Sequence, residues 1–310
     1  MYPIKFENLY FEKVWGGRDF EAFRDNLPED KIGESWDVAC HKNGMSVVSN
    51  GEFKGKSFEE IINLCGSRIL GKDIKKEFPL LIKLINSSDK LSIQVHPNDE
   101  YAKQVENSSG KTEFWYVVDA KKGAKLVIGT KDCDKKKFGE AIKNDRTEEY
   151  LNVIEVERGD CFLIKSGLVH AIGEGVIIAE IQQSSDITYR IYDYHRGRAL
   201  HIKKALDVIN FSLDAKNIAG KVIEKDSGFE KIGLCASEYF TIEKYSVISE
   251  IKEASDENRF FIFTCVDGNG KIEDENKNIT LVEKGDSILI PACLGMYKIS
   301  GKLKLLKSYV

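Results

Sequence analysis

Residues 152–192 read NVIEVERGDCFLIKSGLVHAIGEGVIIAEIQQSSDITYRIY, and this stretch decides the fold. It divides into apolar runs of about strand length, separated by glycine, serine and aspartate. Short β-rich runs at this spacing are typical of a β-sandwich or β-barrel, and they are unlike an α/β nucleotide-binding fold. The sequence therefore predicts a mainly β protein.

Part of this stretch returns near the end of the chain. VERGDCFLI at 156–164 is matched by VEKGDSILI at 282–290, which predicts two copies of one β unit. In this alignment His170 lies opposite Met296, and aligning Asp119 with Asp267 places Glu113 opposite Phe261, so the second copy has lost both polar residues. Gly-Asp before an apolar strand is also a common turn, and a chance match is the alternative explanation.

Helices are predicted beside this β framework. Ser57-Phe58-Glu59-Glu60 forms a capping box, and the apolar residues after it recur at helical spacing as far as Gly71. Further helical segments are predicted over 98–107, 134–151 and 201–211. These segments would form a small helical flank.

Composition narrows the class of protein. In 310 residues, 46 basic and 50 acidic side chains nearly cancel, so we expect neither a nucleic-acid groove nor a membrane surface. Seven widely spaced cysteines form no C-x-x-C pair and are expected to be reduced thiols. The opening residues MYPIKFENLYFEKVWGG lack a basic segment followed by an apolar run, so we expect a cytoplasmic protein.

The stretch LSIQVHPND at 91–99 carries the first candidate ligands. Side chains alternate between the two faces of a strand, so Gln94 and His96 share the face opposite Ile93 and Val95, and Pro97 ends the strand. A lone histidine on such a strand is more often structural than functional. Additional ligands elsewhere in the chain are needed to make it a metal site.

Those additional residues occur in a recognisable order. Gly159 to His170 resembles the second motif of the cupin superfamily of small β-barrels, with Lys165 where proline is usual, but the usual first motif with two histidines is missing. Together the motifs resemble the short bacterial form of the type I mannose-6-phosphate isomerases, over nearly the whole chain. The segments that carry this resemblance are VWGG at 14–17, IGESWDVA at 32–39, LSIQVHPND at 91–99, GKTEFWYVV at 110–118, VHAIGEG at 169–175 and IAEIQQSSDITYRIYDY at 178–194.

The resemblance implies specific roles. It implies one zinc ion per chain, an active-site arginine at Arg190, and a substrate pocket that includes Lys111 and Glu180; the implied zinc ligands are Gln94, His96, Glu113 and His170. Two imidazoles, a carboxylate and an amide without a thiolate suit zinc, but also manganese, iron or cobalt. Cations available for a phosphate are Lys111, Arg190, Arg196 and Arg198, and the proton carrier is left open among Glu180, Lys111, His96 and water.

We therefore expect two cupin-type jelly-roll β-barrel lobes with a small helical flank: a catalytic metal-binding domain over 1–215 and a degenerate domain without metal over 216–310. The expected activity is isomerisation of mannose 6-phosphate and fructose 6-phosphate through an enediol by a monomer or weak homo-oligomer. A non-catalytic sugar-phosphate sensor and a metal-dependent cupin oxygenase are the alternatives. A glycine-rich phosphate loop of the kinase or dehydrogenase type is absent from the sequence.

Overall fold

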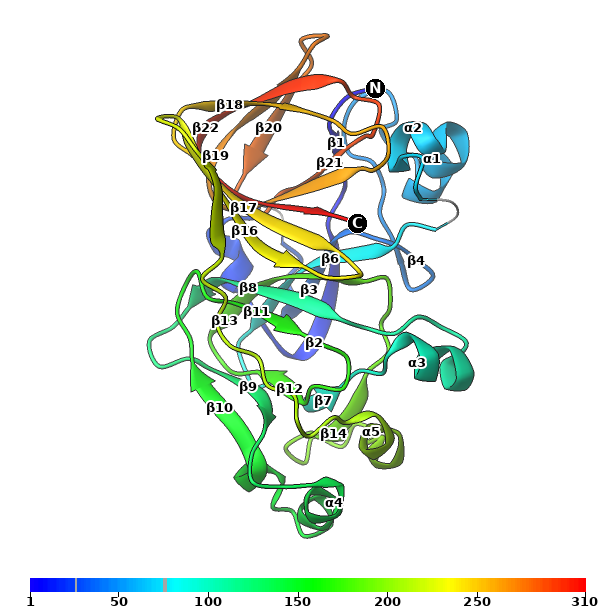
Figure 1. The fold of residues 1–310 in the computed structure, drawn as a ribbon, viewed down its shortest axis with the longest axis vertical. Coiled ribbons are helices and arrows are strands. Elements are labelled where there is room, and N and C mark those ends of the chain that lie inside the picture. The colour runs from blue at the N-terminus through cyan, green and yellow to red at the C-terminus, as the bar shows by residue number, and fades with distance from the viewer. Residues whose placement is uncertain (26, 75–76) are drawn as a thin grey trace.

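The structure is a computed structural model that describes residues 1–25, 27–74 and 77–310. Figure 1 shows two β lobes stacked along the long axis, with helices at the side and at the far end of the first lobe. The first lobe consists of two facing sheets, and the second lobe is one curled sheet. This arrangement confirms the prediction of a mainly β protein with two lobes.

The first lobe contains a six-stranded sheet, a five-stranded sheet and a small hairpin. The six-stranded sheet runs in the order β11 (Cys161–Ile164), β8 (Glu113–Ala120), β13 (Val176–Gln183), β6 (Leu80–Ser87), β3 (Ile32–Val38) and β2 (Leu9–Gly17). The five-stranded sheet runs β10 (Leu151–Glu155), β9 (Lys125–Thr130), β12 (His170–Ile172), β7 (Ile93–Val95) and β14 (Tyr189–Tyr192), and the hairpin is β4 (Cys40–His41) with β5 (Gly44–Met45). The sheets remain open at their edges, so the first lobe is a sandwich of two sheets.

The second lobe is a nine-stranded sheet. Its main path is β1 (Ile4–Lys5), β21 (Ser287–Ile290), β19 (Phe261–Asp274), β22 (Met296–Tyr309), β17 (Thr241–Val247), β16 (Phe229–Ala236) and β15 (Lys221–Lys225), while β18 (Glu250–Ala254) pairs with β22 and β20 (Ile279–Glu283) pairs with β19. The long strands β19 and β22 pair with several partners along their length, which curls the sheet around its own apolar core.

The internal repeat is visible in the strand pairing. In the first lobe β8 pairs antiparallel with β11, and Glu113 lies opposite Ile164. In the second lobe β19 pairs antiparallel with β21, and Phe261 lies opposite Ile290. Glu113 and Phe261 therefore occupy the same register in the two copies, as the sequence alignment predicts.

The helices follow their sequence signals, but two predicted segments, the one up to Gly71 and the one over 134–151, are each divided. The chain contains α1 (Phe58–Cys65), α2 (Ser67–Leu70), α3 (Asp99–Glu106), α4 (Lys135–Lys143) and α5 (Ile202–Val208), with 3-10 turns η1 (Asp19–Ala22) and η2 (Thr147–Tyr150). Ser57 and Glu60 form the predicted capping box of α1. The single helix expected up to Gly71 is divided, because Gly66 adopts φ 52° and interrupts the helical backbone. None of the helices in the described residues is long and apolar enough to cross a lipid bilayer.

The six-stranded sheet is buried on both faces. Every residue of β6 and β13 is buried, because one face points into the first lobe and the other packs against the second lobe. The core between the lobes joins Leu84, Phe114 and Ile181 of this sheet to Ile262 and Leu306 of the second lobe. This packing explains the near-continuous apolar runs of β6 and β13, and it holds the inner face of the sheet in place.

A buried ion pair links the two lobes. Arg24 contacts Asp37 at 2.8 Å and also donates hydrogen bonds to Ser35 Oγ at 2.7 Å and to the Gly285 carbonyl at 2.7 Å. The side chains of Arg24 and Asp37 are 5% and 1% exposed. Since Gly285 belongs to the turn before β21, this guanidinium joins the N-terminal segment to the repeat turn of the second lobe.

We predict that Asp37→Ala strongly destabilises the protein. The substitution leaves the Arg24 guanidinium buried without its counter-ion, which should lower the free energy of unfolding by about 3–5 kcal/mol. Urea denaturation of both proteins measures this loss. As a control, Glu257→Ala removes one partner of the exposed pair between Lys72 and Glu257 and should change stability little. An Asp37→Ala variant as stable as the control would contradict the prediction.

Candidate metal centre and substrate cavity

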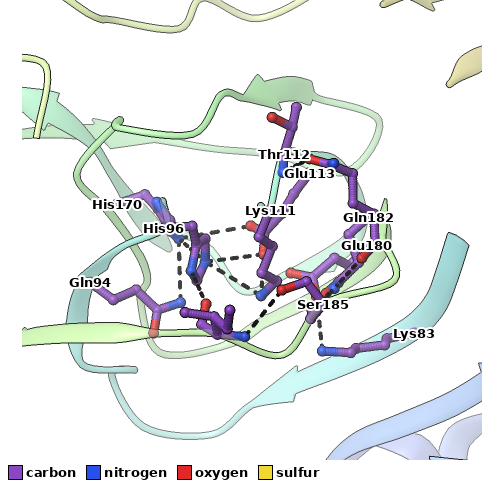
Figure 2. Close-up of polar contacts among 12 residues, drawn as sticks. Lys83, Gln94, His96, Lys111, Thr112, Glu113, His170, Glu180, Gln182 and Ser185 are labelled. Carbon is purple, nitrogen blue, oxygen red and sulfur yellow. Dashed lines mark hydrogen bonds and ion pairs between the residues drawn. The ribbon is translucent and has the colours of Figure 1, made fainter. Parts of the chain in front are cut away.

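Four of the predicted site residues converge on one point inside the first lobe. His96 follows β7, His170 begins β12, Glu113 begins β8, and Gln94 lies opposite His170 across the β7–β12 pairing. His96, Glu113 and His170 are 1%, 0% and 0% exposed. Figure 2 shows the two imidazoles and the carboxylate pointing toward one another, with the Lys111 ammonium beside them.

The two histidines are held as neutral rings, with each Nδ1 bonded to a backbone carbonyl and each Nε2 directed toward the cluster. His96 Nδ1 lies 2.7 Å from the Ile187 carbonyl, and His170 Nδ1 lies 2.8 Å from the Leu168 carbonyl. Since a carbonyl only accepts, each Nδ1 carries the proton and each Nε2 carries a lone pair. Burial and the charge of Lys111 lower the pKa of His96 to about 3, and burial also lowers the pKa of His170.

These lone pairs face each other and a carboxylate. His96 Nε2 lies 3.1 Å from His170 Nε2 and 3.2 Å from Glu113 Oε1, and His170 Nε2 lies 3.8 Å from Glu113 Oε2. The three donor atoms lie within 4.8 Å of one another. Ligand atoms of a tetrahedral zinc ion bound at about 2.0–2.1 Å are about 3.3 Å apart, so the spacing fits a metal ion. The second shell also fits, because both Nδ1 atoms are anchored by carbonyls.

Glu113 is poorly satisfied by the protein itself. Neither carboxylate oxygen accepts a hydrogen bond of good geometry from the described residues, although Lys111 Nζ comes within 2.5 Å of Oε1. Burial alone would raise the pKa of Glu113, but Lys111 and His96 lower it well below its usual range. A buried, ionised carboxylate with unused lone pairs is the chemistry expected of a metal ligand.

Gln94 lies at the edge of this cluster. Its Nε2 is 3.3 Å from His170 Nε2. The two ends of an amide are assigned from such contacts, and a turn of the amide by 180° would present Oε1 to the cluster instead. In that orientation the amide would offer the cluster a fourth oxygen or nitrogen donor atom.

A cavity of about 420 Å³ adjoins the cluster. Lys111, Glu180 and Arg190, which the sequence predicts for the pocket, all line it together with Gln94 and Arg198. Arg190 donates to Ser92 Oγ at 3.2 Å and to the Ala199 carbonyl at 2.9 Å. Asp193 contacts both Arg198 and Arg196. Arg198 lines the cavity, whereas Arg196 lies outside it and also donates to Asp89 and to the Lys90 carbonyl. The cavity wall thus combines fixed cations with a carboxylate.

Sequence reasoning missed several residues of the cavity wall, namely Lys13, Glu34, Lys83 and Asp186. Lys83 lies in the centre of β6, is 5% exposed, and contacts Glu180 at 3.5 Å and Glu34 at 3.7 Å. A lysine within the apolar run PLLIKLI is a signal that could have identified it, because a charge is rarely buried without a partner. Lys13, Glu34 and Asp186 lie beside other polar residues in the sequence and carry no such signal.

Comparison with known proteins bears on the family. A family model described as "Phosphomannose isomerase type I, catalytic domain" matches residues 4–139, and one described as "Mannose-6-phosphate isomerase, cupin domain" matches residues 231–310. Mannose-6-phosphate isomerase ManA of Bacillus subtilis is 34% identical over 316 residues, covering 99% of this chain and 99% of the relative. The chain belongs to the type I mannose-6-phosphate isomerase family.

Other members of the family agree. The mannose-6-phosphate isomerase of Streptococcus mutans is 33% identical, with 99% of this chain and 98% of the relative covered. The crystal structure of the Bacillus subtilis mannose 6-phosphate isomerase superposes with a TM-score of 0.94 at 31% identity and covers 100% of both chains. The cupin-type fold expected from the sequence is thereby confirmed.

The carboxylate of Glu34 should make the stability of the fold depend on pH. Glu34 lies 3.2 Å from Lys13 Nζ and accepts a hydrogen bond from Trp36 Nε1 at 2.8 Å. Burial alone would raise its pKa, but Lys83 and Lys13 lower it from 4.5 to about 2. Because the folded pKa is depressed, ionised Glu34 stabilises the fold above about pH 4.5, and this contribution is lost as pH falls toward 2.

We therefore expect Glu34→Gln to destabilise the protein at neutral pH and to do so less in acid. The difference in free energy of unfolding from the wild type should narrow by about 1 kcal/mol between pH 6 and pH 3.5. Urea titrations of both proteins across this range measure the narrowing, and Glu29→Gln on the exposed surface is the control. A difference that stays constant or widens toward low pH would exclude this pKa shift.

Proposed function

We propose that the protein interconverts mannose 6-phosphate and fructose 6-phosphate, with a metal ion held by His96, Glu113 and His170 and with Gln94 as a fourth ligand. The observation that carries this proposal is the buried cluster of two neutral imidazoles and an ionised carboxylate beside a cavity lined by cations. The names of the related proteins point to the same reaction. The donor set, two nitrogens with a carboxylate and no thiolate, favours zinc.

The reaction requires a proton to move between C1 and C2 of the sugar. We assign this transfer to Glu180, which is 3% exposed, lines the cavity, and has its pKa raised by burial and by the charge of Glu113. A carboxyl group with a raised pKa can take the C2 proton and return it to C1. Trp115 Nε1 donates to Glu180 Oε2 at 2.9 Å and Lys83 contacts Oε1 at 3.5 Å, so the carboxyl group is held in one orientation.

The negative charge that develops on the sugar oxygens must also be stabilised. Zinc, when bound, would polarise these oxygens as a Lewis acid. Arg190 adds a fixed positive charge from the cavity wall, and Lys111 adds an ammonium whose pKa is raised by Glu113 and Glu180 against the effect of burial. A proton carrier alone supplies only about 10² to 10⁴ in rate, so the reaction depends on these charges.

The phosphate group of the substrate would be bound by Arg198 and Arg190. Both guanidinium groups line the cavity, and Asp193 orients Arg198 by accepting from its Nε at 2.9 Å. Planar guanidinium groups match the geometry of phosphate oxygens.

The cavity residues all precede residue 199, which supports a catalytic domain over 1–215 and a second domain over 216–310 without metal. All ligands come from one chain, so a monomer or weak homo-oligomer would suffice.

The cellular setting of the reaction is also part of the proposal. All seven cysteines are free thiols, which agrees with a reducing cytoplasm.

The decisive experiment is conversion of mannose 6-phosphate to fructose 6-phosphate by purified protein. We expect turnover that is lost after treatment with a chelator and restored by added Zn²⁺, because the metal supplies Lewis-acid stabilisation that the side chains cannot replace. Manganese, iron and cobalt ions added in parallel identify the preferred metal. Binding of mannose 6-phosphate without turnover by metal-loaded protein would refute the enzyme and indicate a sugar-phosphate sensor.

The ligand assignment has its own test. His170→Ala should remove stoichiometric metal and lower kcat by more than about a hundredfold while circular dichroism stays unchanged. His195→Ala is a matched control, because its imidazole is 72% exposed and contacts only the surface carboxylate of Asp145 among the described ion pairs. Retained metal and full activity in His170→Ala would exclude this residue as a ligand.

A further inference from the structure

The sheet holds Arg190 on one side only. Its strand β14 is the last strand of the five-stranded sheet, so one edge of β14 has no neighbouring strand. Arg190 lies opposite Gln94 of β7, and the pairing becomes irregular between Arg190 and Tyr192. The side chain therefore reaches the cavity from an edge strand beside a bulge, where backbone geometry is least constrained by the ladder.

A histidine replaces the missing strand at this point. The backbone N–H of Arg190 donates to His201 Nδ1 at 3.2 Å, and the backbone N–H of His201 donates to the Arg190 carbonyl at 2.8 Å. Both outward-facing backbone groups of Arg190 are thus bonded to the residue just before α5. The neighbouring Ala199 carbonyl accepts from the Arg190 guanidinium at 2.9 Å, so the segment 199–201 holds both ends of the arginine.

We infer that His201 is a positioning residue for Arg190, and that its unprotonated Nδ1 fixes the backbone from which the guanidinium reaches the substrate. This inference rests on the proposed function. The imidazole does not line the cavity and acts only through Arg190. A protonated imidazole would present an N–H to the N–H of Arg190, so this contact exists only in the neutral form.

The surroundings of His201 keep the ring neutral. Arg190 on β14 and Lys204 on α5 place positive charges near the imidazole. The centroid of the Tyr189 ring lies 6.2 Å from that of the His201 ring. Glu106 on α3 opposes them, but its carboxylate is already engaged by Lys204 at 2.7 Å and by Tyr189 Oη at 2.8 Å. Burial together with Arg190 and Lys204 lowers the pKa of His201 below its usual value.

Three variants test the inference with mannose 6-phosphate as substrate. His201→Ala removes the acceptor, and we expect kcat/KM at pH 7.5 to fall about fivefold to tenfold with metal content unchanged. His201→Asn places Oδ1 where Nδ1 was, and we expect it to recover most of the activity. His195→Ala removes a histidine from the same segment between β14 and α5 but leaves the contacts of Arg190 unchanged. Its kcat/KM should equal that of the wild type.

A pH profile separates positioning from a general structural effect. In the wild type, protonation of His201 should add a decline of kcat/KM on the acid side, and His201→Asn should lack this decline because an amide does not titrate. Full activity in His201→Ala, or equal losses in His201→Ala and His201→Asn, would overturn the inference. If His201→Ala fails to fold, the pH profile of His201→Asn still tests the inference. A decline of kcat/KM on the acid side equal to that of the wild type would overturn the positioning role of His201. Absence of turnover in the wild type would instead refute the proposed function.

Discussion

Two imidazole lone pairs and a carboxylate face one another inside the first lobe, and such a group of acceptors needs positive charge among them. Water is largely excluded from these side chains, so their mutual repulsion is weakly screened. The Lys111 ammonium meets part of this need at Glu113, 2.5 Å from one oxygen. A divalent cation would meet it for all three ligands at once. Much of the surrounding structure can be understood as the framework that keeps these acceptors together.

That framework explains which parts of the site were predictable. Alternation along a strand places Gln94 and His96 on one face, and a cross-strand pairing brings His170 opposite Gln94, so local rules and motif order bring the proposed ligands together. Lys83 interrupts an apolar run, but its partner Glu180 lies on a distant strand, and no local pattern specifies that pairing or the backbone contact of His201. The break at Gly66 was missed for a different reason. The apolar residues keep helical spacing on both sides of this glycine, so the spacing alone indicates one helix.

The repeat shows how one β unit can serve two purposes. At the register where the first lobe has Glu113, the second lobe has Phe261, and the Lys307 ammonium lies 3.8 Å from the centre of that ring. Lys307 also contacts Glu253 at 3.3 Å and Tyr245 Oη at 3.3 Å. A covalently attached cation paired with an aromatic face and a carboxylate thus occupies the interior of the second lobe. The sequence alignment predicted the loss of the polar residue but could not predict the ammonium.

The pairing of β1 with β21 has a consequence for synthesis of the chain. Ile4 pairs with Leu289 and Lys5 with Ile288, so the second lobe includes a strand that is synthesised long before its partner. Contacts this distant in sequence carry a large loop-closure entropy and slow folding. Until β21 is available, the fully buried Ile4 lacks its partner strand, while Tyr2 and Phe6 can already pack against Phe53 and Phe58. The order of translation therefore makes completion of the second lobe a late event in folding.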